Sequence, residues 1–195
     1  MDRLSLVIVA VTAIALGACK DGKGFDEPPP PTSRVNAVAA APKKAVDLDA
    51  FCDVRRSGSD APTFAFPELA ESPPVLAGKW HWVNVWATWC KPCIKEMPML
   101  AKWQSELGSF DLEFLSIDES AQVIDDYRKD HATTPQTLRI KSTDAVEDWV
   151  ASTGLDRGAT IPIHVFVDPD EKIRCVRSGA IHLQDRAAIV ALLAQ

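Results

Sequence analysis

The sequence lacks features that mark several other classes of protein. It has no long basic cluster: 27 acidic residues outnumber 21 basic ones, and the net charge is −6. Proteins that hold nucleic acid by its phosphates need a basic surface, so no nucleic-acid partner is predicted. No internal repeat is visible. A hydrophobic content of 47% over 195 residues is enough for one packed domain.

The chain also starts with a hydrophobic run that is too short to span a membrane comfortably. Residues 4–16 are largely apolar, a length that suits the central part of a signal peptide. They end in LGAC, in which small residues precede Cys19 as in the bacterial lipobox. We predict a lipoprotein signal peptide over residues 1–18 and lipid on Cys19. A plain secretory signal or an uncleaved anchor is the alternative, and every version places the domain outside the cytoplasm.

Helical and strand periods are missing from residues 20–45, which are rich in proline and alanine. Such a composition is typical of an extended linker. In the polyproline II conformation this segment would reach roughly 80 Å. We therefore predict a lipid-anchored linker over residues 19–45 and a single globular domain over residues 46–195.

Within that domain, strand-like and helix-like segments alternate. The pattern predicts a layered α/β fold in which helices flank a central mixed sheet. The turn sequence DPDE at residues 168–171 indicates that the last two strands form an antiparallel hairpin. The predicted strands are 80–87, 112–117, 163–167 and 172–177, with extended segments at 63–66 and 136–140. The predicted helices are 91–107, 121–129, 145–152 and 183–193.

Cysteine is scarce, and its five copies are an odd number, so one must be free, modified or intermolecular if the others pair. Two of them stand in WCKPC, between a predicted strand and a predicted helix. At a helix N-terminus, free backbone N–H groups and the helix dipole stabilise a thiolate on Cys90, and Lys91 adds positive charge. Cys93 follows one turn later and can close a small disulfide ring. The spacing predicts a nucleophile and a resolving thiol.

A metal-binding site is the main alternative for this cysteine pair. Structural zinc needs more ligands, yet Cys52 and Cys175 are isolated and the four histidines are scattered. Met97 and Met99 are possible soft ligands for Cu(I), although methionine on a helix more often fills a core. Copper binding stays open as an alternative, while no resident metal or other cofactor is predicted.

Taken together, these motifs resemble the thioredoxin superfamily, in particular its membrane-anchored extracytoplasmic reductases of the TlpA/ResA type. The resemblance extends over about residues 60–195 and implies a thioredoxin-like fold with an N-terminal extension, in a monomer. The matching segments are VNVW at 83–86, WCKPC at 89–93, Glu96, Pro98, TIP at 160–162 and FVD at 166–168.

The resemblance implies a catalytic role for three residues. Cys90 would be the exposed nucleophile, and Cys93 the buried partner that resolves the mixed disulfide. Glu96 would be the carboxylate that tunes thiol protonation. Asn84 stands where thioredoxins carry an aspartate, so proton handling would rest on Glu96 and water.

The resemblance also implies a substrate-binding loop. Pro162 matches the proline that is cis in the superfamily and packs against the cysteine pair. The backbone of Ile161 would pair with an extended substrate strand, and Thr160 and Trp89 would line the same groove. His164 is expected to be a residue of the sheet without a catalytic role.

Two cysteines lie outside the active-site motif. In an oxidising compartment, Cys52 and Cys175 are predicted to form a structural disulfide that ties the N-terminal extension to the sheet edge. Closing so long a loop would contribute about 4–5 kcal/mol. Two unpaired thiols, or a pair with a sensing role, are the alternatives.

The function that follows is a thiol:disulfide oxidoreductase, lipid-anchored on the periplasmic face of a bacterial cell envelope. The resemblance implies that Pro92 between the cysteines belongs to the reducing type. The resemblance implies apocytochrome c or copper-site cysteines as substrates and a membrane electron donor; a copper metallochaperone is the alternative. A peroxidase would need proline and threonine seven and three positions before its cysteine, where Val83 and Ala87 stand.

Overall fold

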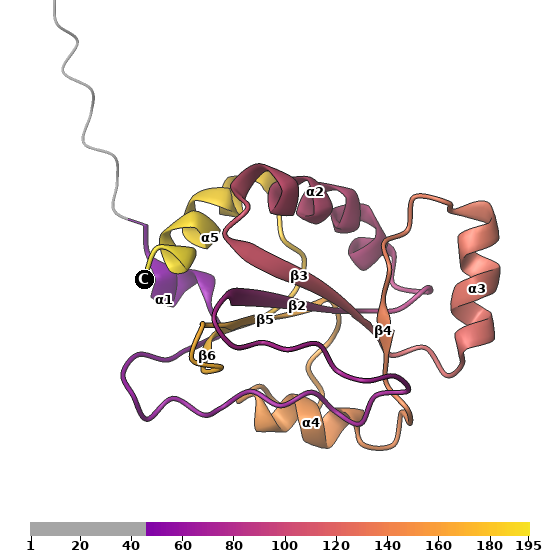
Figure 1. The fold of residues 1–195 in the computed structure, drawn as a ribbon, viewed down its shortest axis with the longest axis horizontal. Helices are drawn as coiled ribbons and strands as arrows, with labels where there is room; N and C mark the ends of the chain where they lie inside the picture. The colour runs from indigo at the N-terminus through magenta and orange to yellow at the C-terminus, as the bar shows by residue number, and fades with distance from the viewer. Residues whose placement is uncertain (1–45) are drawn as a thin grey trace, which may run out of the picture. The chain divides into compact units, whose positions relative to one another are not determined.

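A computed structural model describes residues 46–195; the predicted signal peptide, Cys19 and the linker lie outside the described residues. Six strands of the described part form one mixed sheet in the order β1-β6-β5-β2-β3-β4 (Figure 1). Neighbours β2, β3 and β4 run parallel, whereas β5 is antiparallel to β2 and β6, and β1 to β6. The strands are β1 (Val54–Arg55), β2 (Trp80–Trp86), β3 (Phe110–Ser116), β4 (Leu138–Arg139), β5 (Ile163–Val167) and β6 (Ile173–Ser178).

Helices cover both faces of this sheet. The helices are α1 (Leu48–Phe51), α2 (Lys91–Leu107), α3 (Ala121–Asp130), α4 (Val146–Ser152) and α5 (Arg186–Leu193), the last preceded by the 3-10 turn η1 (Leu183–Asp185). Helices α2 and α5 lie over one face, with α1 in contact with α5, and α4 lies over the other face (Figure 1). Helix α3 flanks the edge at β4. The predicted class, a central mixed sheet flanked by helices, is confirmed.

Strand β2 lies in the middle of the sheet and is buried along its whole length. Because successive side chains point to opposite faces, Trp82 joins the apolar cluster beneath α2 and α5, while Val83 and Val85 join the cluster on the α4 side. A strand covered on both faces is expected to be apolar without alternation, and this explains the aromatic and β-branched run. The strand ends at the loop that carries the cysteine pair.

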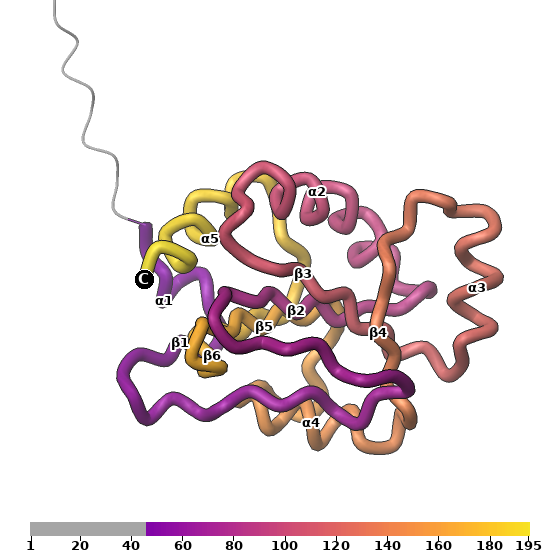
Figure 2. The backbone as a smooth tube through the Cα atoms, in the orientation of Figure 1, coloured from indigo at the N-terminus to yellow at the C-terminus, as the bar shows by residue number. Residues whose placement is uncertain are grey.

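The extended stretch predicted at residues 63–66 does not become a strand of the sheet. Only an isolated bridge joins Thr63 to Lys172. The prolines at positions 62 and 67 have no N–H to donate to a ladder. The indole of Trp149 donates instead to the carbonyl of Ala65, at 2.8 Å. This connection between β1 and β2 therefore runs beside α4 as an irregular segment (Figure 2).

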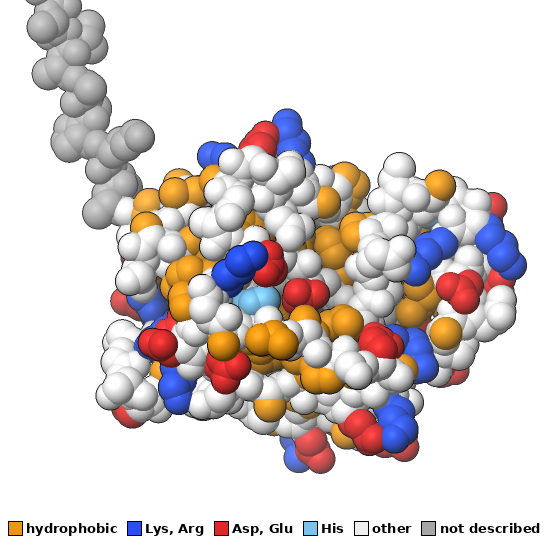
Figure 3. All heavy atoms as spheres, viewed as in Figure 1, with side chains coloured by type: hydrophobic (Ala, Val, Ile, Leu, Met, Phe, Trp, Pro, Cys, Tyr) orange, Lys and Arg blue, Asp and Glu red, His pale blue; other side chains and the backbone are white. Residues whose placement is uncertain are grey.

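Other differences concern the ends of elements. The sequence analysis missed α1 and β1, which have four and two residues and are too short to show a period. The helix predicted over 183–193 begins as a 3-10 turn, in which the Asp185 carboxylate accepts from the backbone N–H of His182 at 2.8 Å. On the face drawn in Figure 3, acidic and basic side chains of the described residues are interspersed with hydrophobic ones.

Candidate active site

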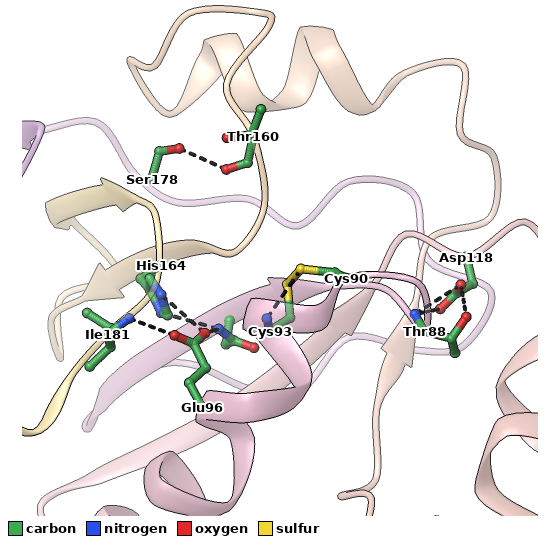
Figure 4. The surroundings of a disulfide bond; sticks show 10 residues. Thr88, Cys90, Cys93, Glu96, Asp118, Thr160, His164, Ser178 and Ile181 are labelled. Atoms are coloured by element: carbon green, nitrogen blue, oxygen red, sulfur yellow. Dashed lines mark hydrogen bonds and ion pairs between the residues drawn. A yellow bond between two sulfur atoms is a disulfide. The ribbon is translucent and has the colours of Figure 1, made fainter.

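Cys90 and Cys93 form a disulfide at the start of α2 (Figure 4). Cys90 is the N-cap residue, with an extended backbone, and its Sγ accepts from the N–H of Cys93 at 3.3 Å. Pro92 occupies the first turn, where a missing N–H costs nothing. The free N–H groups of this helix end therefore face the sulfur of Cys90, and they and the helix dipole would stabilise its thiolate.

Cys90 is less exposed than expected for a nucleophile. In the disulfide form it is 4% exposed and Cys93 is 0% exposed. Both belong to the apolar cluster that includes Trp86 and Ala87, and Ile161 packs against that cluster. A reaction partner can therefore reach the disulfide only at Cys90.

A buried carboxylate that the sequence analysis missed holds the loop before Cys90. Asp118 accepts from the backbone N–H of Thr88 at 3.1 Å and from its hydroxyl at 2.8 Å (Figure 4). It also accepts from the hydroxyl of Ser116 at 2.8 Å. Strands β2 and β3 are parallel, so the loops that follow them leave the sheet at one edge. A polar residue just after a buried parallel strand was the available signal for Asp118.

Glu96 is buried rather than an ordinary exposed residue of α2. It is 3% exposed. Its Oε1 accepts from Nδ2 of Asn84 at 2.9 Å, and its Oε2 accepts from the N–H of Ile181 at 2.6 Å. Burial raises the pKa of Glu96 to about 7, although these hydrogen bonds and the charge of Arg177 act in the opposite direction. A carboxyl group with this pKa can accept or donate a proton near neutral pH.

His164 lies on β5, as expected, but it also lies beside Glu96. It is fully buried, and its Nε2 is 3.4 Å from Oε1 of Glu96. The indole Nε1 of Trp82 donates to its Nδ1 at 3.1 Å, and Nδ2 of Asn84 is 3.3 Å from the same atom. The amide nitrogen of Asn84 thus lies within hydrogen-bond distance of both the Glu96 carboxyl group and the ring of His164.

The loop before β5 contains the residues predicted to bind substrate. The Ile161–Pro162 peptide bond is cis. The carbonyl of Thr160 accepts from the hydroxyl of Ser178, and that of Pro162 accepts from the N–H of Gly179, both at 2.8 Å. Among the described residues, neither the N–H nor the carbonyl of Ile161 has a hydrogen-bond partner. This leaves Ile161 open for pairing with another strand.

Trp89 lies next to the cysteine pair and is 67% exposed. A large apolar side chain in this position can contact a bound protein. It lines a hollow together with Ile117, Val123 and Val146. Trp89 is therefore placed on the surface that a substrate of Cys90 would approach.

A second disulfide joins Cys52, between α1 and β1, to Cys175 on β6. The two cysteines are 6% and 0% exposed. Since β1 also pairs with β6, this disulfide adds a covalent tie where the N-terminal part of the domain meets the sheet.

Two further features concern only residues 46–195. No group of three or more histidine, cysteine or acidic side chains in this range is placed to hold a metal ion. None of its helices combines the length and the hydrophobicity that a membrane span requires.

A mixed sheet with a Cys-Lys-Pro-Cys disulfide at a helix N-terminus defines a thioredoxin-like thiol–disulfide oxidoreductase. Residues 58–176 match the AhpC/TSA family, and the chain belongs to this family. Thiol-disulfide oxidoreductase ResA of Oceanobacillus iheyensis is 27% identical over 139 residues, which are 67% of this chain and 69% of that protein. ResA of Bacillus subtilis is 25% identical over 133 residues, 64% and 68% of the two chains.

Solved structures show the same fold. The thioredoxin domain of a thiol-disulfide oxidoreductase from Bacteroides vulgatus superimposes with a TM-score of 0.54 at 21% identity, over 73% of this chain and 100% of that one. A thioredoxin-related protein from Neisseria meningitidis serogroup B gives a TM-score of 0.53 at 25% identity, over 64% and 94%. The expected thioredoxin-like fold is thereby confirmed.

Proposed function

We propose that this thiol–disulfide oxidoreductase is a reductant of disulfides in substrate proteins outside the cytoplasm. The observation that carries the proposal is the placement of the cysteine pair. Cys90 caps α2 with its sulfur against free N–H groups, while Cys93 is completely buried behind it. One sulfur is thus placed to attack a partner and the other to resolve the product.

The reaction proceeds in two exchanges. In the reduced enzyme, the thiolate of Cys90 attacks one sulfur of a substrate disulfide, forms a mixed disulfide and expels a substrate thiolate, which takes up a proton. The thiol of Cys93 then loses its proton and attacks Cys90. The bond to the substrate breaks, and the second substrate thiolate leaves and takes up a proton. Of the two protons that the substrate gains, one balances the proton lost by Cys93 and the other comes from solvent. The substrate gains two electrons and two protons, and the enzyme ends as the Cys90–Cys93 disulfide.

Glu96 would serve as the proton acceptor for Cys93. The two residues are three positions apart on α2 and therefore lie on the same side of the helix. A carboxyl group whose pKa is raised to about 7 by burial is suited to exchange a proton with a thiol near neutral pH.

The loop before β5 would hold the substrate. The unpaired backbone groups of Ile161 offer one donor and one acceptor to an extended segment of a partner. Pairing of this kind depends little on the partner's sequence. Thr160, Trp89 and the ring of Pro162 would supply side-chain contacts around the substrate cysteine.

The setting of the enzyme is also part of the proposal. The LGAC sequence supports removal of residues 1–18 and lipidation of Cys19, with residues 19–45 as a linker to a bacterial membrane and the domain on its periplasmic face. The proposed substrates are the paired cysteines of apocytochrome c or copper-site cysteines. A membrane electron donor would reduce the enzyme again, and the enzyme would act as a monomer.

The first experiment is a redox titration of Cys90 and Cys93 against glutathione or dithiothreitol buffers, combined with an insulin-reduction assay. A potential near or below about −250 mV supports a reductant, whereas a value near about −120 mV makes the enzyme an oxidant and refutes the direction. If the reduced protein instead binds one Cu(I) tightly and does not reduce insulin, the copper metallochaperone is the better explanation.

Lipidation is tested separately, in cells that express the full chain. Labelled fatty acid should be incorporated into the wild type and not into Cys19→Ser, and only the wild type should stay with the membrane after a salt wash. Equal labelling of the two proteins would contradict the anchor and leave the redox proposal unaffected.

A further inference from the structure

His164 is a buried titratable residue to which the reaction above assigns no role. The register of the sheet places it directly opposite Asn84 of β2 and Arg177 of β6. Residues opposite each other in antiparallel strands project to the same face. The three polar side chains therefore form a row across the face that α2 covers, and Asn84 and His164 both approach Glu96 (Figure 4).

The hydrogen bonds of His164 determine which ring nitrogen carries a proton. Nδ1 lies 3.1 Å from the indole Nε1 of Trp82 and 3.3 Å from Nδ2 of Asn84. An indole N–H can only donate, so Nδ1 must accept. In a neutral imidazole the proton then resides on Nε2, the nitrogen 3.4 Å from Oε1 of Glu96.

The surroundings keep His164 neutral. Burial is the main cause, and the positive charge of Arg177 adds to it; together they lower the pKa of His164 to about 3, although the Gly179 backbone acts in the opposite direction. At neutral pH the contact with Glu96 is therefore not an ion pair. It brings a neutral N–H donor next to a carboxyl group.

Glu96 is the acceptor placed to use this donor. Nε2 of His164 is buried and makes no hydrogen bond of good geometry among the described residues, although the Gly179 backbone lies near enough to the ring to raise its pKa. A buried donor without a partner costs free energy. The distance of 3.4 Å to Oε1 is longer than an ideal hydrogen bond, and Oε1 is the carboxylate oxygen nearest to this donor.

We propose that His164 is a positioning residue for Glu96: its Nε2–H orients the carboxyl group at Oε1 and favours the ionised form. The other groups around Glu96 are the Asn84 amide, the Ile181 N–H and the charge of Arg177, with Cys93 one turn away on α2. The inference rests on the proposed role of Glu96 as proton acceptor, and it concerns how readily Glu96 accepts that proton.

The test follows the carboxyl carbon of Glu96 by NMR in the oxidised full chain labelled with ¹³C-glutamate. Glu96→Gln assigns the signal. His164→Leu should raise the midpoint of the Glu96 titration by about one pH unit, a tenfold change in the protonation constant, because the carboxylate loses a donor. His164→Gln can accept from Trp82 and donate to Glu96, so it should return the Glu96 midpoint most of the way to the wild-type value.

His81→Leu is the matched control, because His81 is 2% exposed and lies on the neighbouring strand β2. It should leave the Glu96 midpoint unchanged. An unchanged midpoint in folded His164→Leu would overturn the proposal.

If His164→Leu does not fold, the tautomer of His164 in the wild-type protein still tests the proposal. The ¹⁵N shifts of its imidazole must show a proton on Nε2 and none on Nδ1, and the reverse tautomer refutes the proposal. These NMR measurements use oxidised protein without substrate, so their result is independent of insulin reduction. The role of His164 can therefore be refuted while the proposed function holds, and the proposed function can be refuted while the role of His164 holds.

Discussion

The Cys52–Cys175 disulfide joins residues 123 positions apart, whereas Cys90–Cys93 joins residues three apart. The two disulfides are about equally buried, with exposures of 6% and 0% in the first and 4% and 0% in the second. Burial therefore does not separate a structural disulfide from a reactive one in this molecule. The differences are the length of the closed loop and the helix N-terminus at Cys90, which stabilises the thiolate that leaves when the bond opens.

The largest effect is expected from Cys90→Ser. Without the nucleophile, insulin reduction should fall by roughly a thousandfold or more. Stability in urea should change little, because a three-residue loop restricts the unfolded chain only slightly. The double variant Cys52→Ser, Cys175→Ser is the matched control and should keep its activity per folded molecule. Substantial activity in Cys90→Ser would mean that another cysteine starts the reaction.

The same double variant should lose about 5 kcal/mol of unfolding free energy, since the loop it opens is long. Urea unfolding of the oxidised protein, monitored by tryptophan fluorescence, measures the loss. A loss of less than about 1 kcal/mol would show that loop length does not distinguish the two disulfides.

Glu96→Gln tests the pH dependence of the redox site. The pKa of Glu96 is raised to about 7 in the folded protein. Protonated Glu96 therefore stabilises the fold at pH values below its pKa in the unfolded chain, and this stabilisation is lost as the pH rises through about 7. The free energy of unfolding of the variant, relative to that of the wild type, should therefore increase by up to about 3 kcal/mol between pH 4 and pH 8. This increase is expected whatever the difference between the two proteins at pH 4. Glu119→Gln, at an exposed position, should show no such gain. A constant difference would contradict the raised pKa.

The smallest effect is expected from Asp118→Asn. The amide keeps one acceptor oxygen for the donors of Thr88 and Ser116, so the variant should lose about 1–2 kcal/mol of stability. Asp125→Asn on the exposed side of α3 is the control. Equal urea midpoints for the two variants would show that this carboxylate does not hold the loop before Cys90.

Local patterns were sufficient for much of the fold. The predicted helix over 91–107 has the bounds of α2, and β5 and the antiparallel hairpin with β6 are present as predicted. These segments are long or carry strong turn residues. The short elements α1 and β1 are held by distant partners, and residues 63–66 are held by Trp149. No local pattern contains such contacts.

The mixed α/β architecture and the position of the Cys-Lys-Pro-Cys motif at a helix start follow from local sequence patterns, because both depend on periodicity and on neighbours within one turn. The environment of the site, by contrast, depends on the assembled fold. The burial of Cys90, the raised pKa of Glu96 and the contact with His164 depend on residues far apart in the chain: Glu96 is 85 positions from Ile181 and 68 positions from His164. Side chains so distant meet only when the sheet assembles, and the desolvation that shifts their protonation arises at that step.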